Sequence, residues 1–422
     1  MHTASQALAI ERQASAQPSL AERVSRPKTR SILGLLRLNF LSVKGASNTS
    51  AGLPAKKAVH RLVQSYDGYV SATMRNNSLY ALYTPSVSGE VSFIREFKLN
   101  DFDGDESAVV QIYTQSGSAS LRAFFYSDHK LYMFGERPEV FDLETNETVY
   151  SEYIAKANPA WSELGSVFMY DGTVYRPFGW SDYSQGLDVV RDYKLVGHLP
   201  LDLEFDRPFA DQYFYGFSVS REVFCVYSLD TQTILLELDL EPYRIDQLPI
   251  DKQVVRCGNR LFVLAGSSVL LIDLELNRLV AEFNHVEQEA FQALRSAGYI
   301  YSNAYAYKIS VAHDGFVLSH ASSPSFMMYV TVCGTDMRFA WISHSRSEVT
   351  VINTEGDLLF GIEDARAKAW DKFTGEEIWQ ASAGTMASGI ELGDNWVVYT
   401  HPSGDLQCFR WKKPYLSPHR PS

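Results

Sequence analysis

Short runs of apolar residues alternate with polar ones from about residue 58 onward, and turn residues separate the runs. Alternation with a period of two is typical of β-strands that bury one face. Pairs such as Asp171-Gly172 and Gly258-Asn259 supply the positive φ that tight hairpin turns need. One segment, Val286–Ser296, has helical periodicity and is followed by Gly298. The pattern therefore predicts an all-β body with one short helix.

One sequence element repeats along this body. Its complete copy has an apolar strand end, then Asp371, Thr374 and Gly375, and Trp379 eight residues after the aspartate. Weaker copies keep these offsets: Asp142 with Thr145, Asn146 and Tyr150, Asp230 with Thr233 and Leu238, and Asp273 with Asn277. Asp and Thr side chains accept hydrogen bonds from nearby backbone N–H groups, and Gly or Asn tolerates the left-handed conformation. We expect a turn at each copy, with the large residue at offset eight packed against the neighbouring unit.

The spacing of the repeat indicates the architecture. The four aspartates are 88, 43 and 98 residues apart, which corresponds to two, one and two units of 43–49 residues. A four-stranded blade of a β-propeller takes about this length. The span from Val59 to Trp411 holds seven or eight such units. The sequence thus predicts a β-propeller of seven or eight four-stranded blades, preceded by a basic arm.

The complete copy, Ala369-x-Asp371-x-x-Thr374-Gly375-x-x-x-Trp379, resembles the tryptophan-docking repeat of the pyrroloquinoline-quinone-like propellers and, more broadly, the repeats of WD-like propellers. The resemblance covers most of residues 58–412 at the level of the period. It implies that each such tryptophan stacks against a peptide plane of the adjacent blade. That family includes quinone-dependent dehydrogenases as well as propellers that bind no cofactor and serve as scaffolds, so the resemblance concerns the fold.

Charge divides the chain into an arm and a body. Residues 1–57 contain nine Lys and Arg against two Glu, a net charge of +7, whereas residues 58–422 contain 29 basic and 48 acidic residues, a net charge of −19. We expect a partly disordered or amphipathic arm over 1–57, a propeller over 58–413 and a C-terminal tail over 414–422. The apolar stretch Ser31–Val43 is too short and too interrupted for a membrane helix.

The cysteines favour a reducing compartment. Cys225 and Cys408 lie in strand-like runs and are expected to be buried thiols, and no Cys-x-x-Cys pair occurs. A cytoplasmic location is therefore the expectation. The alternative is an organelle or export, because the Arg/Ser-rich, acid-poor arm has the composition of a transit peptide.

The acidic body favours a basic protein or a cation as partner and argues against nucleic acid, whose phosphates it would repel. Two runs alternate strictly between apolar and acidic residues. Period-two geometry places three acids of each run on one strand face: Asp202, Glu204 and Asp206, and then Glu237, Asp239 and Glu241. These acids are candidates for binding a basic partner. The alternative is a solvated strand face on which like charges prevent edge-to-edge pairing.

The segment Asn100–Glu106 contains Asp101, Asp103 and Asp105 around Gly104. Carboxylates at alternate positions in a Gly-containing loop can wrap Ca²⁺, which takes six to eight oxygen ligands. The run resembles the calcium loops of integrin-type propellers, although Glu106 and Val109 replace the Gly and the closing Asp of that pattern. Calcium is the metal that this loop would bind, and an acidic inter-blade loop is the alternative.

The sequence shows no motif of a known enzyme chemistry. It has no Gly-x-Ser-x-Gly elbow, no Gly-x-x-x-x-Gly-Lys-Ser/Thr loop, no His-x-x-x-His pair and no adjacent cysteines such as quinone-dependent dehydrogenases carry. We therefore assign no catalytic and no cofactor-binding residue. The expected function is a non-catalytic propeller that binds a protein partner, for example as an inhibitor or antidote of a basic enzyme. The alternative is an enzyme that uses the propeller funnel, whether quinone-dependent, hydrolytic or lyase-like.

Overall fold

The structure is a computed structural model of the chain. It describes residues 55–61, 68–75, 78–85, 93–98, 109–114, 121–127, 129–135, 139–151, 168–179, 185–191, 194–203, 211–218, 221–244, 252–299, 306–312, 314–320, 325–345, 349–381, 389–393, 396–400, 405–410 and 415–420.

The described strands form eight antiparallel sheets, of which seven have four strands and one has three. The first four sheets in chain order consist of β2 (Gly68–Arg75), β3 (Ser78–Pro85), β4 (Phe93–Lys98) and β5 (Val109–Thr114); β6 (Leu121–Ser127), β7 (Lys130–Gly135), β8 (Glu139–Asp142) and β9 (Glu147–Ser151); β10 (Phe168–Tyr170), β11 (Thr173–Gly179), β12 (Gln185–Arg191) and β13 (Lys194–Pro200); and β14 (Tyr213–Phe217), β15 (Val223–Ser228) and β16 (Thr233–Asp239).

The remaining sheets follow in the same order along the chain. They consist of β17 (Lys252–Cys257), β18 (Arg260–Ala265), β19 (Ser268–Asp273) and β20 (Arg278–Asn284); β21 (Ala306–Ala312), β22 (Gly315–His320), β23 (Ser325–Cys333) and β24 (Asp336–Ser345); β25 (Val349–Glu355), β26 (Leu358–Glu363), β27 (Arg366–Asp371) and β28 (Glu377–Gln380); and β29 (Gly389–Gly393), β30 (Trp396–Thr400) and β31 (Asp405–Arg410) together with β1 (Ala55–Arg61).

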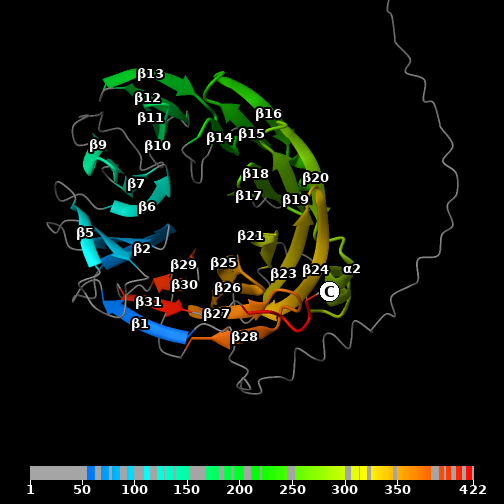
Figure 1. The fold of residues 1–422 in the computed structure, drawn as a ribbon. Helices are drawn as coiled ribbons and strands as arrows, with labels where there is room; N and C mark the ends of the chain where they lie inside the picture. The colour runs from blue at the N-terminus through cyan, green and yellow to red at the C-terminus, as the bar shows by residue number, and fades with distance from the viewer. Residues whose placement is uncertain are drawn as a thin grey trace, which may run out of the picture. The chain divides into compact units, whose positions relative to one another are not determined.

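The first strand closes the body. β1 pairs with β31 as the outer strand of the last sheet, so segments from opposite ends of the body lie side by side. Along the inner side, β2 contacts β6 and β29, and β21 contacts β17 and β25. Figure 1 shows these sheets following one another around a ring. The protein has an all-β propeller fold, as the sequence predicts. Because β1 begins at Ala55, the last three residues of the expected arm belong to a sheet.

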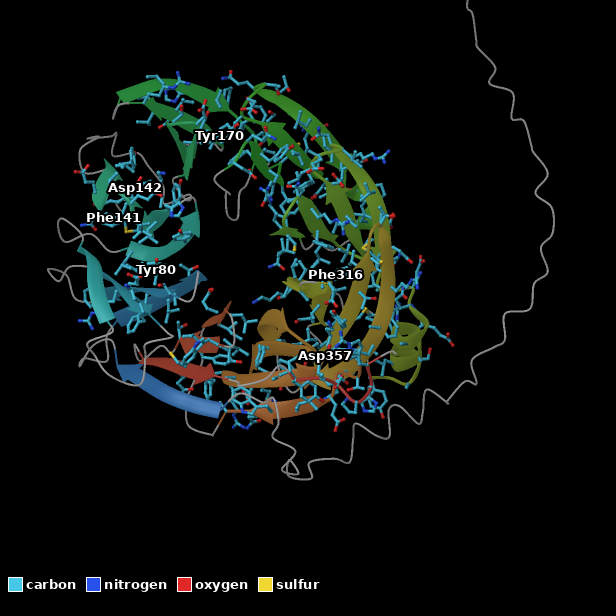
Figure 2. The ribbon with its side chains drawn as sticks, viewed as in Figure 1. Tyr80, Phe141, Asp142, Tyr170, Phe316 and Asp357 are labelled. Atoms are coloured by element: carbon cyan, nitrogen blue, oxygen red, sulfur yellow. The ribbon has the colours of Figure 1, made fainter. Side chains whose placement is uncertain are left out.

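Large side chains between neighbouring sheets form the core. Tyr80 and Tyr126 stack with ring centroids 5.8 Å apart and join the first two sheets; Figure 2 shows the position of Tyr80. Farther along the chain, a cluster of buried apolar residues lies between β14–β16 and β17–β20, and further clusters follow between later sheets. Face-to-face packing of this kind is how propeller blades bury both faces of a sheet.

The repeated turn has the expected geometry at three of its four aspartates. One carboxylate oxygen of Asp142, Asp273 and Asp371 accepts hydrogen bonds from the backbone N–H groups two and three residues later, at 2.8–3.1 Å. Four residues after each aspartate the backbone φ is positive, at Asn146, Asn277 and Gly375 respectively. Short polar side chains and glycine therefore shape these turns as the sequence indicates.

The predicted alignment is wrong at Asp230. Ser228, not Asp230, occupies the first turn position, since its hydroxyl accepts the N–H of Thr231 at 3.2 Å and Gln232, four residues later, has φ 54°. A serine hydroxyl can replace the carboxylate because either oxygen accepts a backbone N–H. The repeat is therefore shifted by two residues in this sheet.

A register shift recurs in the outermost strand pair of every described sheet. The outer-strand residues just after the shift are Ala58, Tyr113, Tyr150, Gly197, Leu236, Ala281, Trp341 and Trp379. A bulge re-aims the side chains that follow it. Leu236, not Leu238, is thus the counterpart of Trp379, and Trp341 is a further member that the sequence repeat did not include.

Two short elements pack on the sheets. The helix α2 (Glu289–Ser296) begins three residues later than predicted, because Asn284 Oδ1 accepts the N–H groups of Val286 and Glu287 and holds them in a turn. Gly298, with φ 77°, ends the helix as expected. The 3₁₀ helix η3 (Glu241–Tyr243) follows β16.

The C-terminal segment 415–420 is attached to the sheet of β25–β28. The Tyr415 hydroxyl donates to Asp371 Oδ2 at 3.0 Å, and the Ser417 N–H donates to Asp357 Oδ2 at 2.9 Å. Figure 2 marks the position of Asp357, which is buried. Burial and the charge of Asp371 raise the pKa of Tyr415. The hydroxyl therefore stays protonated and remains a donor to this carboxylate at neutral pH.

Candidate interaction surface

The second acidic run lies on an exposed edge. Glu237 and Asp239 are exposed on β16, the outer strand of its sheet, and Glu241 is exposed in η3. The prediction that all three acids share one strand face is wrong for Glu241. β16 ends at Asp239, and Pro242 then removes a backbone donor, so the ladder does not continue.

Two arginines neutralise part of this negative charge. Arg221 donates to both carboxylate oxygens of Glu237, at 3.0 and 3.1 Å, and this bidentate contact and the charge of Glu237 raise the pKa of Arg221. Arg244 lies 2.9 Å from Glu241 and 3.5 Å from Glu222. With Asp239, whose carboxylate accepts the Glu241 N–H at 3.0 Å, this region has four acids and two arginines among the described residues. We refer to these side chains together with one exposed apolar residue as the β16 patch: Glu222, Glu237, Asp239, Glu241, Arg221, Arg244 and Ile234.

The first acidic run is arranged differently from the prediction. Its described residues follow β13, which ends at Pro200, and they are not in a strand. Asp202 is half-buried between the buried Leu201 and Leu203, and it accepts the Ser218 hydroxyl at 2.6 Å. Asp202 therefore contributes a contact within the protein. Glu204 and Asp206 lie outside the described residues.

The clearest docking contact between sheets involves Trp341 of β24. Its indole N–H donates to the carbonyl of Lys372 at 2.7 Å, and its ring lies against Gly375 of the next sheet. A Cβ atom on Gly375 would lie 2.7 Å from the ring. Sequence reasoning missed Trp341 because the turn before it lacks the aspartate of the repeat. The signal that could have found it is a tryptophan late in an outer strand.

Trp379 occupies the equivalent position one sheet later. Its ring meets Phe409 edge-on at 5.0 Å and lies 6.4 Å from Tyr399, both in the last sheet. The side chain is half-buried. Trp379 thus contacts the neighbouring sheet, as the repeat predicts.

Asp230 joins two sheets although it is not the turn aspartate. Its carboxylate accepts the hydroxyl of Tyr170, from the preceding sheet, at 2.6 Å; Figure 2 shows Tyr170. The hydrogen bond to Asp230 and burial raise the pKa of Tyr170 to about 12. Asp230 therefore connects the turn of one sheet to its neighbour.

A second charged contact connects β21–β24 to β25–β28. Asp314 accepts the Lys372 ammonium at 2.7 Å and the Tyr329 hydroxyl at 2.6 Å. Burial alone would raise the pKa of Asp314, but these two donors and the charge of Lys372 lower it overall. The carboxylate is ionised in the fold and connects the two sheets beside Trp341.

The calcium candidates Asp101, Asp103 and Asp105 lie outside the described residues. Among the residues that the structure does describe, no three His, Cys, Asp or Glu side chains are placed to hold a metal ion, and no helix is long and apolar enough to cross a membrane.

Cys225 and Cys408 are buried free thiols, as predicted. Burial and the charge of Glu237 raise the pKa of Cys225 to about 11, and burial raises the pKa of Cys408 to about 12.

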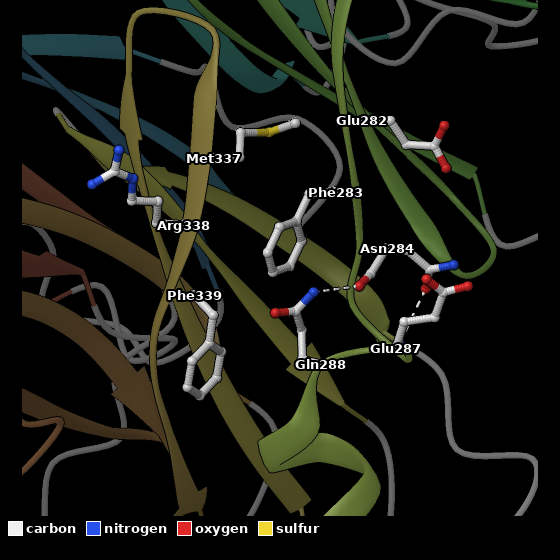
Figure 3. Close-up of a pocket in the computed structure, with 8 residues that line it drawn as sticks. All are labelled: Glu282, Phe283, Asn284, Glu287, Gln288, Met337, Arg338 and Phe339. Atoms are coloured by element: carbon white, nitrogen blue, oxygen red, sulfur yellow. Dashed lines mark hydrogen bonds between the residues drawn. The ribbon is translucent and has the colours of Figure 1, made fainter. Parts of the chain in front are cut away.

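A cleft of about 640 Å³ opens between β20 and β24, beside α2. The residues that line it are Glu282, Phe283, Asn284, Glu287, Gln288, Met337, Arg338 and Phe339. Figure 3 shows Phe283 from one strand and Phe339 from the other on the sides that face the space between them, with Gln288 below Phe283 and beside Phe339. No pattern in the sequence indicates this cleft, because its walls belong to two different sheets.

The comparisons with known proteins concern the fold. No protein-family model and no curated protein sequence matches the chain. Among solved structures, the chain is similar to BamB from Moraxella catarrhalis, with 10% identity and a TM-score of 0.54, over 85% of this chain and 100% of that one. It is also similar to Sqt1 from Saccharomyces cerevisiae, with 10% identity and a TM-score of 0.53, over 86% of this chain and 100% of that one. Both are propeller-like proteins, so the likeness agrees with the fold described above.

Proposed function

We propose that the protein is a non-catalytic β-propeller that binds a basic protein partner through the β16 patch. The observation that carries the proposal is the exposed edge of β16, where Glu237, Asp239 and Glu241 follow an Ile234 that is 51% exposed. Apolar surface beside unbalanced charge suits a protein partner better than a small ion. Inhibition of a basic enzyme is the form of this function that the acidic body suggests.

The two arginines support the same interpretation of the patch. Arg221 and Arg244 show that its carboxylates accept guanidinium groups in bidentate and bridging geometry. Exposed ion pairs of this type add little to stability because water and salt screen them, so a partner arginine can exchange with them at little cost. The excess of acids over arginines attracts positive charge at a distance and speeds association.

The experiment begins with affinity capture of a partner and continues with association kinetics. Surface plasmon resonance on the captured protein compares the parent with the triple variant Glu237→Gln, Asp239→Asn and Glu241→Gln. We expect the variant to associate about tenfold more slowly at low salt, and the parent's rate to fall as salt shortens the Debye length below about 10 Å.

A charge-matched control uses Glu144→Gln, Glu147→Gln and Glu376→Gln, three exposed acids at or beside turns of other sheets. Their loss changes the net charge equally but leaves the β16 patch intact, so association should stay within about twofold of the parent. If both triple variants slow association equally, the overall negative charge of the protein, and not the β16 patch, determines the association rate. Salt-independent association would contradict the proposal outright.

A further inference from the structure

The cleft between β20 and β24 has two strand edges as walls. Each strand is the outermost of its sheet, so within the described residues each has one side without a strand partner. Backbone N–H and C=O groups on such an edge can pair with an added extended chain. β24 spans ten residues, Asp336–Ser345, and is long enough to present several of these groups. The walls therefore suit an extended peptide.

Apolar side chains define what the peptide must carry. Phe283 is buried and its ring packs edge-on against Phe316 at 6.0 Å, so it forms a fixed wall. Met337 and Phe339 on β24 are half-buried and still offer apolar surface to a ligand. Met adapts its shape to different neighbours, and aromatic rings bury a large area. A bulky aliphatic or aromatic side chain fits between these residues.

Charge at the rim selects the flanking residues of the peptide. Glu287 is exposed at the cleft. Glu282 also lines it, but its carboxylate accepts the Ser268 hydroxyl at 2.9 Å and lies on the side of β20 away from Phe283 (Figure 3). Among the described lining residues Arg338 is the one cation, and it is exposed and donates to Asp336 at 2.6 Å. In Figure 3 the Arg338 guanidinium lies on the side of β24 away from Phe283. The rim therefore favours Lys or Arg beside the apolar anchor.

We infer that this cleft binds an extended segment of a partner protein, with one bulky apolar residue flanked by Lys or Arg, added as a strand along β24. The inference rests on the proposed function and adds a second contact surface to it. The β16 patch attracts the partner by charge, whereas the cleft holds a short sequence by apolar burial and backbone pairing.

The test measures fluorescence anisotropy of labelled acetyl-Lys-Lys-Val-Phe-Val-Lys-Lys-amide with the full chain. The matched probe replaces the four lysines by glutamates. We expect saturable binding of the lysine peptide and at least about tenfold weaker binding of the glutamate peptide. Phe339→Ser should weaken binding by about tenfold or more, because it removes an apolar contact. Glu287→Gln should weaken it about twofold to fivefold.

Controls separate folding from recognition. Met337→Gln is a second cleft variant, which tests the same apolar wall if Phe339→Ser lowers the thermal midpoint. Leu276→Ser is the surface control, because it removes a 55% exposed leucine outside the cleft. The inference holds if both cleft variants weaken binding and Leu276→Ser does not. Equal affinity in all variants, or preference for the glutamate peptide, overturns it. So does concentration-dependent self-association that Phe339→Ser abolishes, since the occupant is then a second copy.

The two proposals fail separately. Loss of peptide binding in the cleft variants with unchanged association of the β16 triple variant supports the cleft and contradicts the β16 patch. The opposite result overturns the cleft and leaves the proposed function intact.

Discussion

The indole ring of Trp341 lies against Gly375 of the neighbouring sheet, at a glycine whose φ is 71°. The contact leaves no room for a Cβ atom, and the indole N–H is bonded nearby in the same turn, at Lys372. The left-handed backbone and the close approach both require glycine at this position. Inter-sheet docking and turn geometry are thus coupled at one residue.

Gly375→Ala should be more destabilising than alanine at other left-handed glycines. Gly334 has φ 64°, and no atom lies within 4 Å of the place that an alanine methyl group would take, so Gly334→Ala should cost only the backbone strain of about 1–2 kcal/mol. Gly375→Ala adds the clash with Trp341 and should cost about 1–3 kcal/mol more. Urea unfolding of both variants measures the difference. Equal costs would show that the ring moves aside freely.

Trp379→Ala should destabilise the protein by about 3–5 kcal/mol, as aromatic truncations in packed sites do. The reason is loss of its contacts with Phe409 and Tyr399 across the last inter-sheet boundary. Trp379→Phe keeps a ring at the site and should recover most of the loss. Thermal unfolding of the three proteins checks this, and a midpoint for Trp379→Ala within error of the parent would refute a docking role.

Because of Asp314, the free energy of unfolding should depend on pH in the acid range. Its pKa in the fold lies below the ordinary value of 3.8. The ionised carboxylate therefore contributes fully to the free energy of unfolding above pH 3.8, and this contribution is lost as the pH falls through the folded pKa. Asp314→Asn should cost about 1–3 kcal/mol at pH 7, and the difference from the parent should shrink below about pH 4. Urea unfolding on both sides of the ordinary pKa tests it. A pH-independent difference would contradict the ionised contact with Lys372.

The buried histidines should produce a second acid response, at higher pH. The ring centroids of His285 and His320 lie 5.1 Å apart, and both buried rings contact Phe291 of α2. Burial lowers the pKa of His285 to about 4 despite its contact with the Gly266 carbonyl. Burial, together with the repulsion that protonated His285 would exert, lowers the pKa of His320 well below its usual value. Both are neutral in the fold but charge more readily when unfolded. The free energy of unfolding that the two neutral histidines contribute is complete above about pH 6.5 and declines as the pH falls toward about 4.

His320→Phe should remove part of this slope, which is about 1.4 kcal/mol per pH unit for each histidine. The exposed His419→Gln is the control and should leave the slope unchanged. Free energies of unfolding at closely spaced pH values between about 7 and 4 decide the matter. The prediction fails if His320→Phe and the parent lose stability in parallel over this range.

Truncations should locate the start of the folded body at β1. Deletion of residues 1–54 removes no described strand, and their basic, Ser/Ala-rich composition offers little core, so the thermal midpoint should stay within about 2 °C. Deletion of 1–61 removes β1 and leaves β31 as a bare edge, and should cost about 3–6 kcal/mol. Thermal scans compare the two. If the shorter deletion is the damaging one, the arm contributes to the fold.

The residues alone specified the local structure of this protein. Asp142, Asp273 and Asp371 form the expected turns because a carboxylate, two nearby N–H groups and a residue that tolerates positive φ all lie within five positions. The period of these turns and the alternation of the strands led to a propeller. Such features depend on neighbours in the chain, and that is why a single sequence contains them.

Contacts between sheets were decided by the tertiary structure. Trp341 and Gly375 are 34 positions apart, and the register shift that directs the tryptophan toward the glycine leaves no mark in the residue pattern. Ser228, not Asp230, occupies the first position of its turn, because a serine hydroxyl oxygen can accept the backbone N–H in place of a carboxylate oxygen. Whether an acid is free or paired, as with Glu237 and Arg221, also depends on strands brought side by side. Sequence patterns describe which face a side chain is on, but only packing determines what it meets there.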